Sequence, residues 1–147
     1  LFKFTKSILE DKQIDVYNFG KMKRDFTFIE DLAHAIILLV DAVPRKPNGV
    51  EFNQIKGDSL SPVAPFRIVN IGNSKIVELK SFIEAIEEAL GKKASKNMLP
   101  IQAGDVPATW ANTDLLHSLT GYRPSTSIFS GVKSFVKWYK DYYEIPK

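Results

Sequence analysis

The stretch VYNFGKMKRDFTFIEDL, Val16–Leu32, is the part of the chain around which the rest is interpreted. It passes from a β-rich segment through a turn at Gly20 into a second β-rich run, Phe26–Ile29, and then into a helix with an acidic start. Arg24 stands beside Asp25 where the extended segments meet the helix. Because a guanidinium group meets phosphate or carboxylate oxygens in a fixed fork, this position suits an anionic ligand. On the segment's chemistry alone, a solvated basic turn is the favoured interpretation.

Composition narrows the class of protein. The chain has 147 residues, 44% of them hydrophobic, which suits one domain with a real core. Its 20 basic and 17 acidic residues are scattered, which argues against a nucleic-acid surface. The absence of cysteine excludes disulfides and thiolate metal sites, and it is consistent with a reducing cytoplasm. No apolar run approaches the roughly 18–20 residues of a membrane span, so we expect a soluble, cytoplasmic protein with no membrane partner.

Apolar periodicity predicts five helices. Pro44 ends the second, Gly91 stops the third, and Thr126 is the expected N-cap of the last. The aromatic residues of the last helix, including Trp138, Tyr142 and Tyr143, are expected in the core. The predicted helices are Leu1–Asp11, Glu30–Val43, one centred on Leu79–Leu90, Asp114–Leu119, and one from Ile128 onward.

Short strands alternate with these helices, so the predicted fold class is α/β. The Pro-rich stretch Pro44–Pro65 is expected to be a loop with at most a short strand at Val50–Asn53, and Gly104–Asp105 a turn. Nothing has metal-ligand spacing, because the two histidines, His34 and His117, are far apart. The other predicted strands are Ile14–Asn18, Phe66–Ile71 and Asn97–Gln102.

Four stretches together resemble a known family. KRDFTFIEDLAHAI resembles the RDF/RDY-T segment of nucleotide-sugar epimerases and dehydratases, the extended short-chain dehydrogenase/reductase class. The pattern is most similar to that of UDP-glucuronate 4-epimerases, in which VYNxGxMxRDFT and QxGDVxxTxA runs occur at comparable separations. Three further stretches agree in order: RIVNIGNS at Arg67–Ser74, QAGDVPATWANTDLL at Gln102–Leu116, and GYRPSTSIFSGVKSFVKWYKDYY at Gly121–Tyr143.

The resemblance implies a fold and a place within a larger enzyme. Residues 1–147 would form the substrate-binding C-terminal portion of a Rossmann-type enzyme, with about five helices and short strands. Residues 30–75 would add a helix and a strand to the parent's dinucleotide-binding sheet, with 44–65 a loop. The NAD-binding domain would precede Leu1, and the piece alone would self-associate through uncovered apolar faces.

The resemblance also implies which residues bind the nucleotide. Arg24 stands where these enzymes place an arginine on the UDP diphosphate. Val16 and Tyr17 match the short strand that packs beside the uracil, largely through backbone groups. This chain would therefore bind a UDP-sugar.

The resemblance implies that three residues of the stretch Gln102–Leu116 shape the sugar side of the pocket. Gln102 occupies the position of an arginine in galactose-type epimerases, so it removes one charge while keeping a hydrogen-bonding group. Asp105 would accept a hydrogen bond from a ribose or sugar hydroxyl. Thr109 stands where a bulky side chain limits the sugar in galactose-type enzymes, so it would leave room for a larger or charged one. A plain turn at Gly104 and Asp105 and a surface Thr109 are the alternative.

Two motifs of such enzymes are missing from the sequence. No Gly-rich dinucleotide turn is present, and Tyr17-x-x-x-Lys21 contains Gly20, which disfavours a helical Tyr/Lys pair there. We therefore expect no catalytic residue, metal site or bound NAD in this chain alone, with NAD as the cofactor of the complete enzyme. Two other interpretations stay open: a nucleotide-sugar dehydratase or decarboxylase of the same class, and a non-catalytic binding module.

Overall fold

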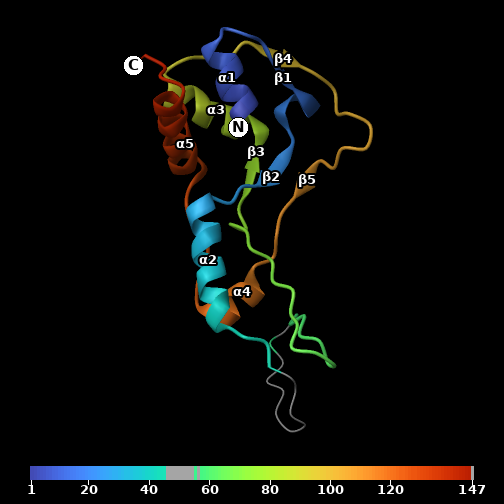
Figure 1. Ribbon diagram of the computed structural model, residues 1–147. Helices are drawn as coiled ribbons and strands as arrows, with labels where there is room; N and C mark the ends of the chain where they lie inside the picture. The colour runs from blue at the N-terminus through green and yellow to red at the C-terminus, as the bar shows by residue number, and fades with distance from the viewer. Residues whose placement is uncertain (46–54, 56, 147) are drawn as a thin grey trace. The chain divides into compact units, whose positions relative to one another are not determined.

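The computed structural model describes residues 1–45, 55 and 57–146, and it divides the chain into two compact units (Figure 1). Unit 1 comprises Leu1–Phe26, Lys75–Thr109 and the segment from Thr126 onward. Unit 2 comprises Thr27–Ser74 and Trp110–Ser125. The described residues form an α/β structure of five α-helices and short strands, which confirms the predicted class.

Unit 1 contains two small sheets. In the first, β1 (Ile14–Val16) pairs in parallel with β4 (Lys96–Met98). In the second, β2 (Lys23–Asp25) is central: it pairs antiparallel with β3 (Ile76–Glu78) and parallel with β5 (Ala108–Thr109). The β-sheets thus bring the start, middle and later parts of the chain into one unit.

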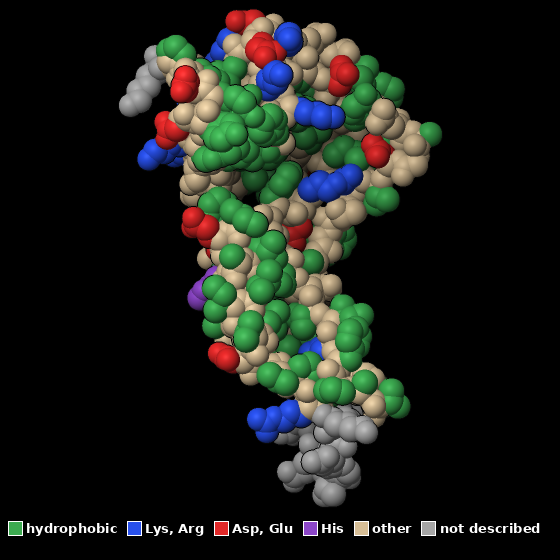
Figure 2. All heavy atoms as spheres, viewed as in Figure 1, with side chains coloured by type: hydrophobic (Ala, Val, Ile, Leu, Met, Phe, Trp, Pro, Cys, Tyr) green, Lys and Arg blue, Asp and Glu red, His purple; other side chains and the backbone are tan. Residues whose placement is uncertain are grey.

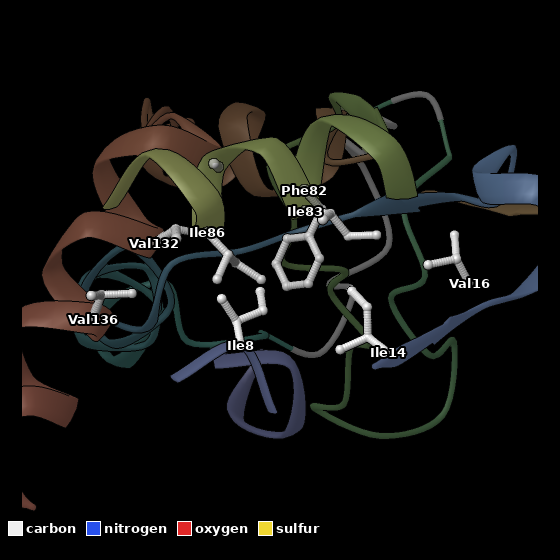
Figure 3. Close-up of a cluster of buried hydrophobic side chains, with 9 residues drawn as sticks. Ile8, Ile14, Val16, Phe82, Ile83, Ile86, Val132 and Val136 are labelled. Carbon is white, nitrogen blue, oxygen red and sulfur yellow. The ribbon is translucent and has the colours of Figure 1, made fainter. Parts of the chain in front are cut away.

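Three helices cover the core of unit 1: α1 (Phe2–Leu9), α3 (Leu79–Leu90) and α5 (Ile128–Tyr142). Their apolar faces meet the side chains of β1, and the ring of Phe82 stacks on that of Phe26 at 4.6 Å. Burial of such side chains is the main favourable term in folding. Figure 3 shows the central members of the cluster, Ile8, Ile14, Val16, Phe82, Ile83, Ile86, Val132 and Val136.

The ends of α3 and α5 follow from local sequence. Gly91, with φ of 68°, takes the left-handed conformation that closes α3, and its N–H donates to the Glu88 carbonyl at 3.2 Å, as the sequence predicts. The predicted N-cap of α5 was wrong by one residue. Ser127, not Thr126, caps the helix, and its Oγ accepts from the N–H of Ser130 at 3.1 Å.

The aromatic residues of α5 divide between core and surface. Tyr139 is 4% exposed, is buried like Val132 and Val136 of the same helix, and has its ring 5.0 Å from that of Phe2, which confirms that part of the expectation. Trp138, Tyr142 and Tyr143 are 48%, 66% and 47% exposed, so placing them in the core was wrong. Only one face of α5 packs against the rest of unit 1, and the ring of Trp138 instead stacks on that of Tyr142 at 5.3 Å.

Unit 2 is built on α2 (Ile29–Asp41) and α4 (Asp114–Thr120). The Asp31 carboxylate joins the two parts of the unit, because it accepts from the Tyr122 hydroxyl at 3.1 Å and from the Ser125 N–H at 3.2 Å. Burial and this hydrogen bond raise the pKa of Tyr122.

The strand predictions fared worse than those for helices. The predicted run Phe26–Ile29 is not a strand, because the strand is Lys23–Asp25 and α2 already begins at Ile29. Phe66–Ile71 forms no β-ladder in the described part of the chain. A strand exists only where its N–H and C=O groups pair with a neighbour, which a local pattern does not reveal.

Two further strands exist but are shorter or shifted. Ile14–Asn18 ends at Val16, where a left-handed turn follows, and Asn97–Gln102 is replaced by Lys96–Met98. The possible strand at Val50–Asn53 lies outside the described residues.

Candidate functional site

Arg24 lies at the middle of β2, the central strand of its sheet, with Val77 and Thr109 as its register partners. The side chain is half-buried, and its Nη1 donates to the Lys23 carbonyl oxygen at 2.8 Å. No carboxylate among the described residues forms an ion pair with it, whereas the neighbouring Lys23 pairs with Glu78 at 3.4 Å. The guanidinium therefore keeps donors for a ligand that carries negative charge.

The structure brings Thr109 to Arg24. Thr109 ends β5 and is exposed, and parallel pairing sets it opposite Arg24 although 85 positions separate them in the chain. Residues paired in this way present their side chains on the same face of a sheet. Two of the residues named from sequence are thus neighbours in space.

Gln102 and Asp105 lie in the loop that joins β4 to β5, and both are exposed. The Asp105 N–H donates to the Gln102 carbonyl at 3.2 Å, and Gly104 has φ of 89°, so the predicted turn at Gly104–Asp105 is confirmed. The loop leads directly into the strand that pairs with Arg24, within unit 1.

Val16 and Tyr17 stand at the carboxyl end of β1. The Val16 side chain is fully buried in the core, and its carbonyl accepts from the Leu99 N–H at 3.0 Å. The side chain of Val16 is therefore a packing element, and its carbonyl is already engaged. Tyr17 is half-buried and begins the short 3₁₀ turn η1 (Tyr17–Gly20).

The η1 turn is a feature that sequence reasoning did not find. Asn18 and Phe19 have φ of 49° and 50°, and Gly20 follows with φ of 77°. Residues other than glycine adopt this left-handed conformation at a cost, and such strain gathers at functional sites. Asn tolerates the conformation well, so Asn18 before Gly20 was a usable signal, but Phe19 gave none.

The same turn bears on the Tyr17-x-x-x-Lys21 spacing. Since Asn18, Phe19 and Gly20 are left-handed, no α-helical turn puts Tyr17 and Lys21 on one face, which confirms the expectation for this pair. In the part of the chain that the structure describes, no group of three or more His, Asp or Glu side chains is placed to hold a metal ion. The described helices include none with the length and apolar character to cross a membrane.

Comparisons with known proteins point in one direction. Residues 1–53 match the family model described as the NAD dependent epimerase/dehydratase family. The chain is 52% identical over 145 residues to an "Uncharacterized 37.6 kDa protein in cld 5'region" of Escherichia coli O111:H-, covering 99% of this chain and 43% of that protein. It is 48% identical over 143 residues to a "Probable UDP-glucuronate 4-epimerase" of Rhizobium meliloti, covering 97% of this chain and 42% of that protein.

A solved structure agrees with these relatives. The UDP-glucuronic acid 4-epimerase of Bacillus cereus, in complex with UDP-glucuronic acid and NAD, superposes with a TM-score of 0.72 at 26% identity. The match covers 95% of this chain and 39% of that one. The chain thus spans about two fifths of the length of the relatives it matches. Over nearly its whole length the chain is similar to a part of these proteins, and its residues 1–53 match the model of the NAD dependent epimerase/dehydratase family.

Proposed function

We propose that this chain is the substrate-binding, C-terminal part of an NAD-dependent nucleotide-sugar 4-epimerase, and that its substrates are UDP-glucuronate and UDP-galacturonate. In the complete enzyme, NAD would supply reversible hydride transfer at the sugar C4. The role of this chain is to hold the UDP group and to shape the space around the sugar. NAD would be held by the domain that precedes this chain, in a cytoplasmic enzyme.

The observation that carries the proposal is the environment of Arg24. Its half-buried guanidinium lies in a central strand, pairs with no described carboxylate, and has the exposed Thr109 beside it. A diphosphate fits such a group, because charged hydrogen bonds to a fixed guanidinium are strong and directional. The names of the Rhizobium meliloti relative and of the Bacillus cereus structure support UDP-glucuronate as the substrate.

The other residues follow from this arrangement as proposed contacts. Tyr17 would lie beside the uracil, with Val16 fixing the strand end from the core. In the loop before β5, Gln102 would donate a hydrogen bond to the ligand and Asp105 would accept one from it. Thr109, next to Arg24, would leave space for the sugar carboxylate.

Calorimetry on the complete protein tests the proposal, with UDP, UDP-glucuronate and UDP-galactose as ligands. Arg24→Ala should weaken UDP binding by about 10- to 150-fold, because a hydrogen bond to a charged group contributes about 1.5–3 kcal/mol. Lys23→Ala is the matched control. It also removes one positive charge, at the neighbouring residue, but the Lys23 side chain is already paired with Glu78. It should change the dissociation constant by less than about twofold.

Three results would contradict the proposal at different levels. Equal UDP affinity in Arg24→Ala and Lys23→Ala would remove Arg24 from the site, and with it the assignment of a UDP-sugar pocket to this chain. If UDP-galactose binds as tightly as UDP-glucuronate, the assignment of a UDP-sugar pocket stands but the assignment of UDP-glucuronate as its substrate is wrong. Release of a 4-keto-6-deoxy product, or of carbon dioxide, would identify a dehydratase or a decarboxylase instead.

A further inference from the structure

Glu87, near the end of α3, is a buried carboxylate outside the site described above. Its side chain is 2% exposed, and Oε1 accepts from the Ala94 N–H at 3.0 Å and from the Lys96 ammonium. Oε2 accepts from the Lys93 ammonium at 2.9 Å. Burial alone would raise the pKa of Glu87, but these hydrogen bonds outweigh it and lower the pKa from 4.5 to about 2. The group is therefore charged whenever the protein is folded near neutral pH.

The two lysine partners of Glu87 differ in their position in the fold and in their exposure. Lys96 is the first residue of β4, and it lies in register with Ile14 of β1. Lys93 belongs to the preceding connection, and its side chain is 86% exposed, compared with 36% for Lys96. The Glu87–Lys96 contact thus fixes the start of a strand, whereas the Glu87–Lys93 contact is largely solvated and contributes less.

β4 connects the Glu87–Lys96 contact to the proposed site. It has only three residues, and Leu99, the residue directly after it, makes two backbone hydrogen bonds to the chain that leaves β1. The Leu99 N–H donates to the Val16 carbonyl at 3.0 Å, and the Leu99 carbonyl accepts from the Phe19 N–H at 3.0 Å. Leu99 therefore holds the left-handed turn that follows Tyr17, and the chain continues from it into the loop that carries Gln102 and Asp105.

We propose that Glu87 is a positioning residue for substrate binding. Through Lys96 it fixes the register of β4 on β1, and through Leu99 that register sets both the Tyr17 turn and the loop before β5. The distance along β4 from Lys96 to Leu99 is about 10 Å at the usual rise of a strand, so Glu87 acts without touching the ligand. This inference rests on the proposed UDP-sugar site, and it assigns a second set of residues to that site.

The test uses the complete protein and compares three variants by UDP calorimetry and steady-state kinetics with UDP-glucuronate. Glu87→Gln keeps an acceptor for Ala94 and removes the charge, and Lys96→Met keeps the aliphatic stem and removes the ammonium. Both should raise the UDP dissociation constant and KM about fivefold and leave kcat unchanged, as expected of residues that act through others. Lys93→Met, the matched control from the same cluster, should behave as the wild type.

A purely structural role makes a different prediction. Val132→Ala, in the core on α5, should lower stability without changing the contacts between Glu87, Lys96 and Leu99. If Glu87 only stabilises the fold, Glu87→Gln and Val132→Ala should bind UDP equally well when their losses of thermal stability are equal. Positioning requires weaker binding only in the Glu87 and Lys96 variants, with faster amide hydrogen exchange at Phe19 and Leu99. Should Glu87→Gln not fold, Lys96→Met and its exchange pattern decide the matter.

The outcomes separate this inference from the function on which it rests. If Arg24→Ala weakens UDP binding but Lys96→Met and Glu87→Gln bind within about twofold of the wild type, Glu87 has no positioning role and the UDP site stands. If Arg24→Ala also leaves UDP binding unchanged, the proposed site itself is wrong.

Discussion

Thr5 places a hydroxyl group in the core of unit 1. It is 0% exposed, and none of the described residues forms a hydrogen bond with its Oγ1. An unsatisfied buried polar group costs about 1–3 kcal/mol, and valine has nearly the same shape. Thr5→Val should therefore raise the free energy of unfolding by about 1 kcal/mol, measured from urea denaturation curves.

Thr113 is the matched control for this change. It is also buried, at 3% exposed, but its Oγ1 lies 2.7 Å from the Ser74 Oγ in a hydrogen bond. Thr113→Val should lower the free energy of unfolding by about 1 kcal/mol, because it removes this hydrogen bond, although the Ser74 hydroxyl keeps its bond to the Ala111 carbonyl at 3.1 Å. A loss of stability in both variants would show that the Thr5 hydroxyl has a partner.

Gly20 is a second residue whose identity the backbone requires. Its φ is 77°, and a Cβ there would stand 2.6 Å from the Lys80 Cγ. Gly20→Ala should destabilise the protein by about 2 kcal/mol, since it combines a left-handed alanine with a displaced lysine stem. Gly104→Ala, at φ of 89° with no atom within 4 Å, bears the conformational cost alone and should lose only about 1 kcal/mol. Equal losses in thermal denaturation would mean that Lys80 moves aside freely.

Single residues also show where reading the sequence succeeded. The left-handed stop at Gly91 and the turn at Gly104 follow from one residue type in one local context, so they could be predicted. The proximity of Arg24 and Thr109 came from a family resemblance, because no local pattern pairs residues so far apart in the chain. Left-handed Phe19 had no signal at all, since neighbouring contacts hold it there.

At the level of elements, the helices could be predicted, whereas two of the predicted strands are shorter or shifted and the others are not strands in the described residues. The apolar repeat of α3 lies within twelve residues, so the sequence contains the whole signal. β2, by contrast, reads Lys-Arg-Asp, and it is a strand because β3 and β5 supply its partners. Partner choice is a tertiary property, and three-residue strands leave little pattern to detect.

The Glu87 cluster that joins α3 to β4 gives a prediction for acid stability. Since the pKa of Glu87 falls from 4.5 to about 2 on folding, its contribution is present above about pH 4.5 and is lost as the pH falls towards 2. Glu87→Gln should be less stable than the wild type by about 3 kcal/mol at pH 7. The gap should close between pH 4.5 and 2 in thermal melts followed by circular dichroism. A gap that persists at pH 2 would mean that the charge of Glu87 is not the source of this stability.

At the level of the whole molecule, unit 2 leaves apolar surface uncovered. Figure 2 shows hydrophobic side chains gathered over α2. Of the thirteen residues of this helix only Ala35 is buried, whereas Ile36, Ile37 and Val40 are 51%, 64% and 68% exposed. A helix that is apolar on most of its faces is normally enclosed by other elements. The proposal that residues 30–75 complete the dinucleotide-binding sheet of a larger enzyme accounts for this composition.

This surface predicts the behaviour of the 147-residue chain when it is prepared by itself. Exposed contiguous apolar patches promote association, so the chain should elute above its monomer mass of 16.6 kDa, increasingly so at higher concentration. Ile37→Lys with Val40→Lys should shift it towards the monomer in gel filtration with light scattering. Phe129→Lys, at an apolar position in unit 1 that is 44% exposed, should not. A concentration-independent monomer would show that α2 needs no cover, and the exposed apolar surface would then no longer support assigning residues 30–75 to a larger sheet.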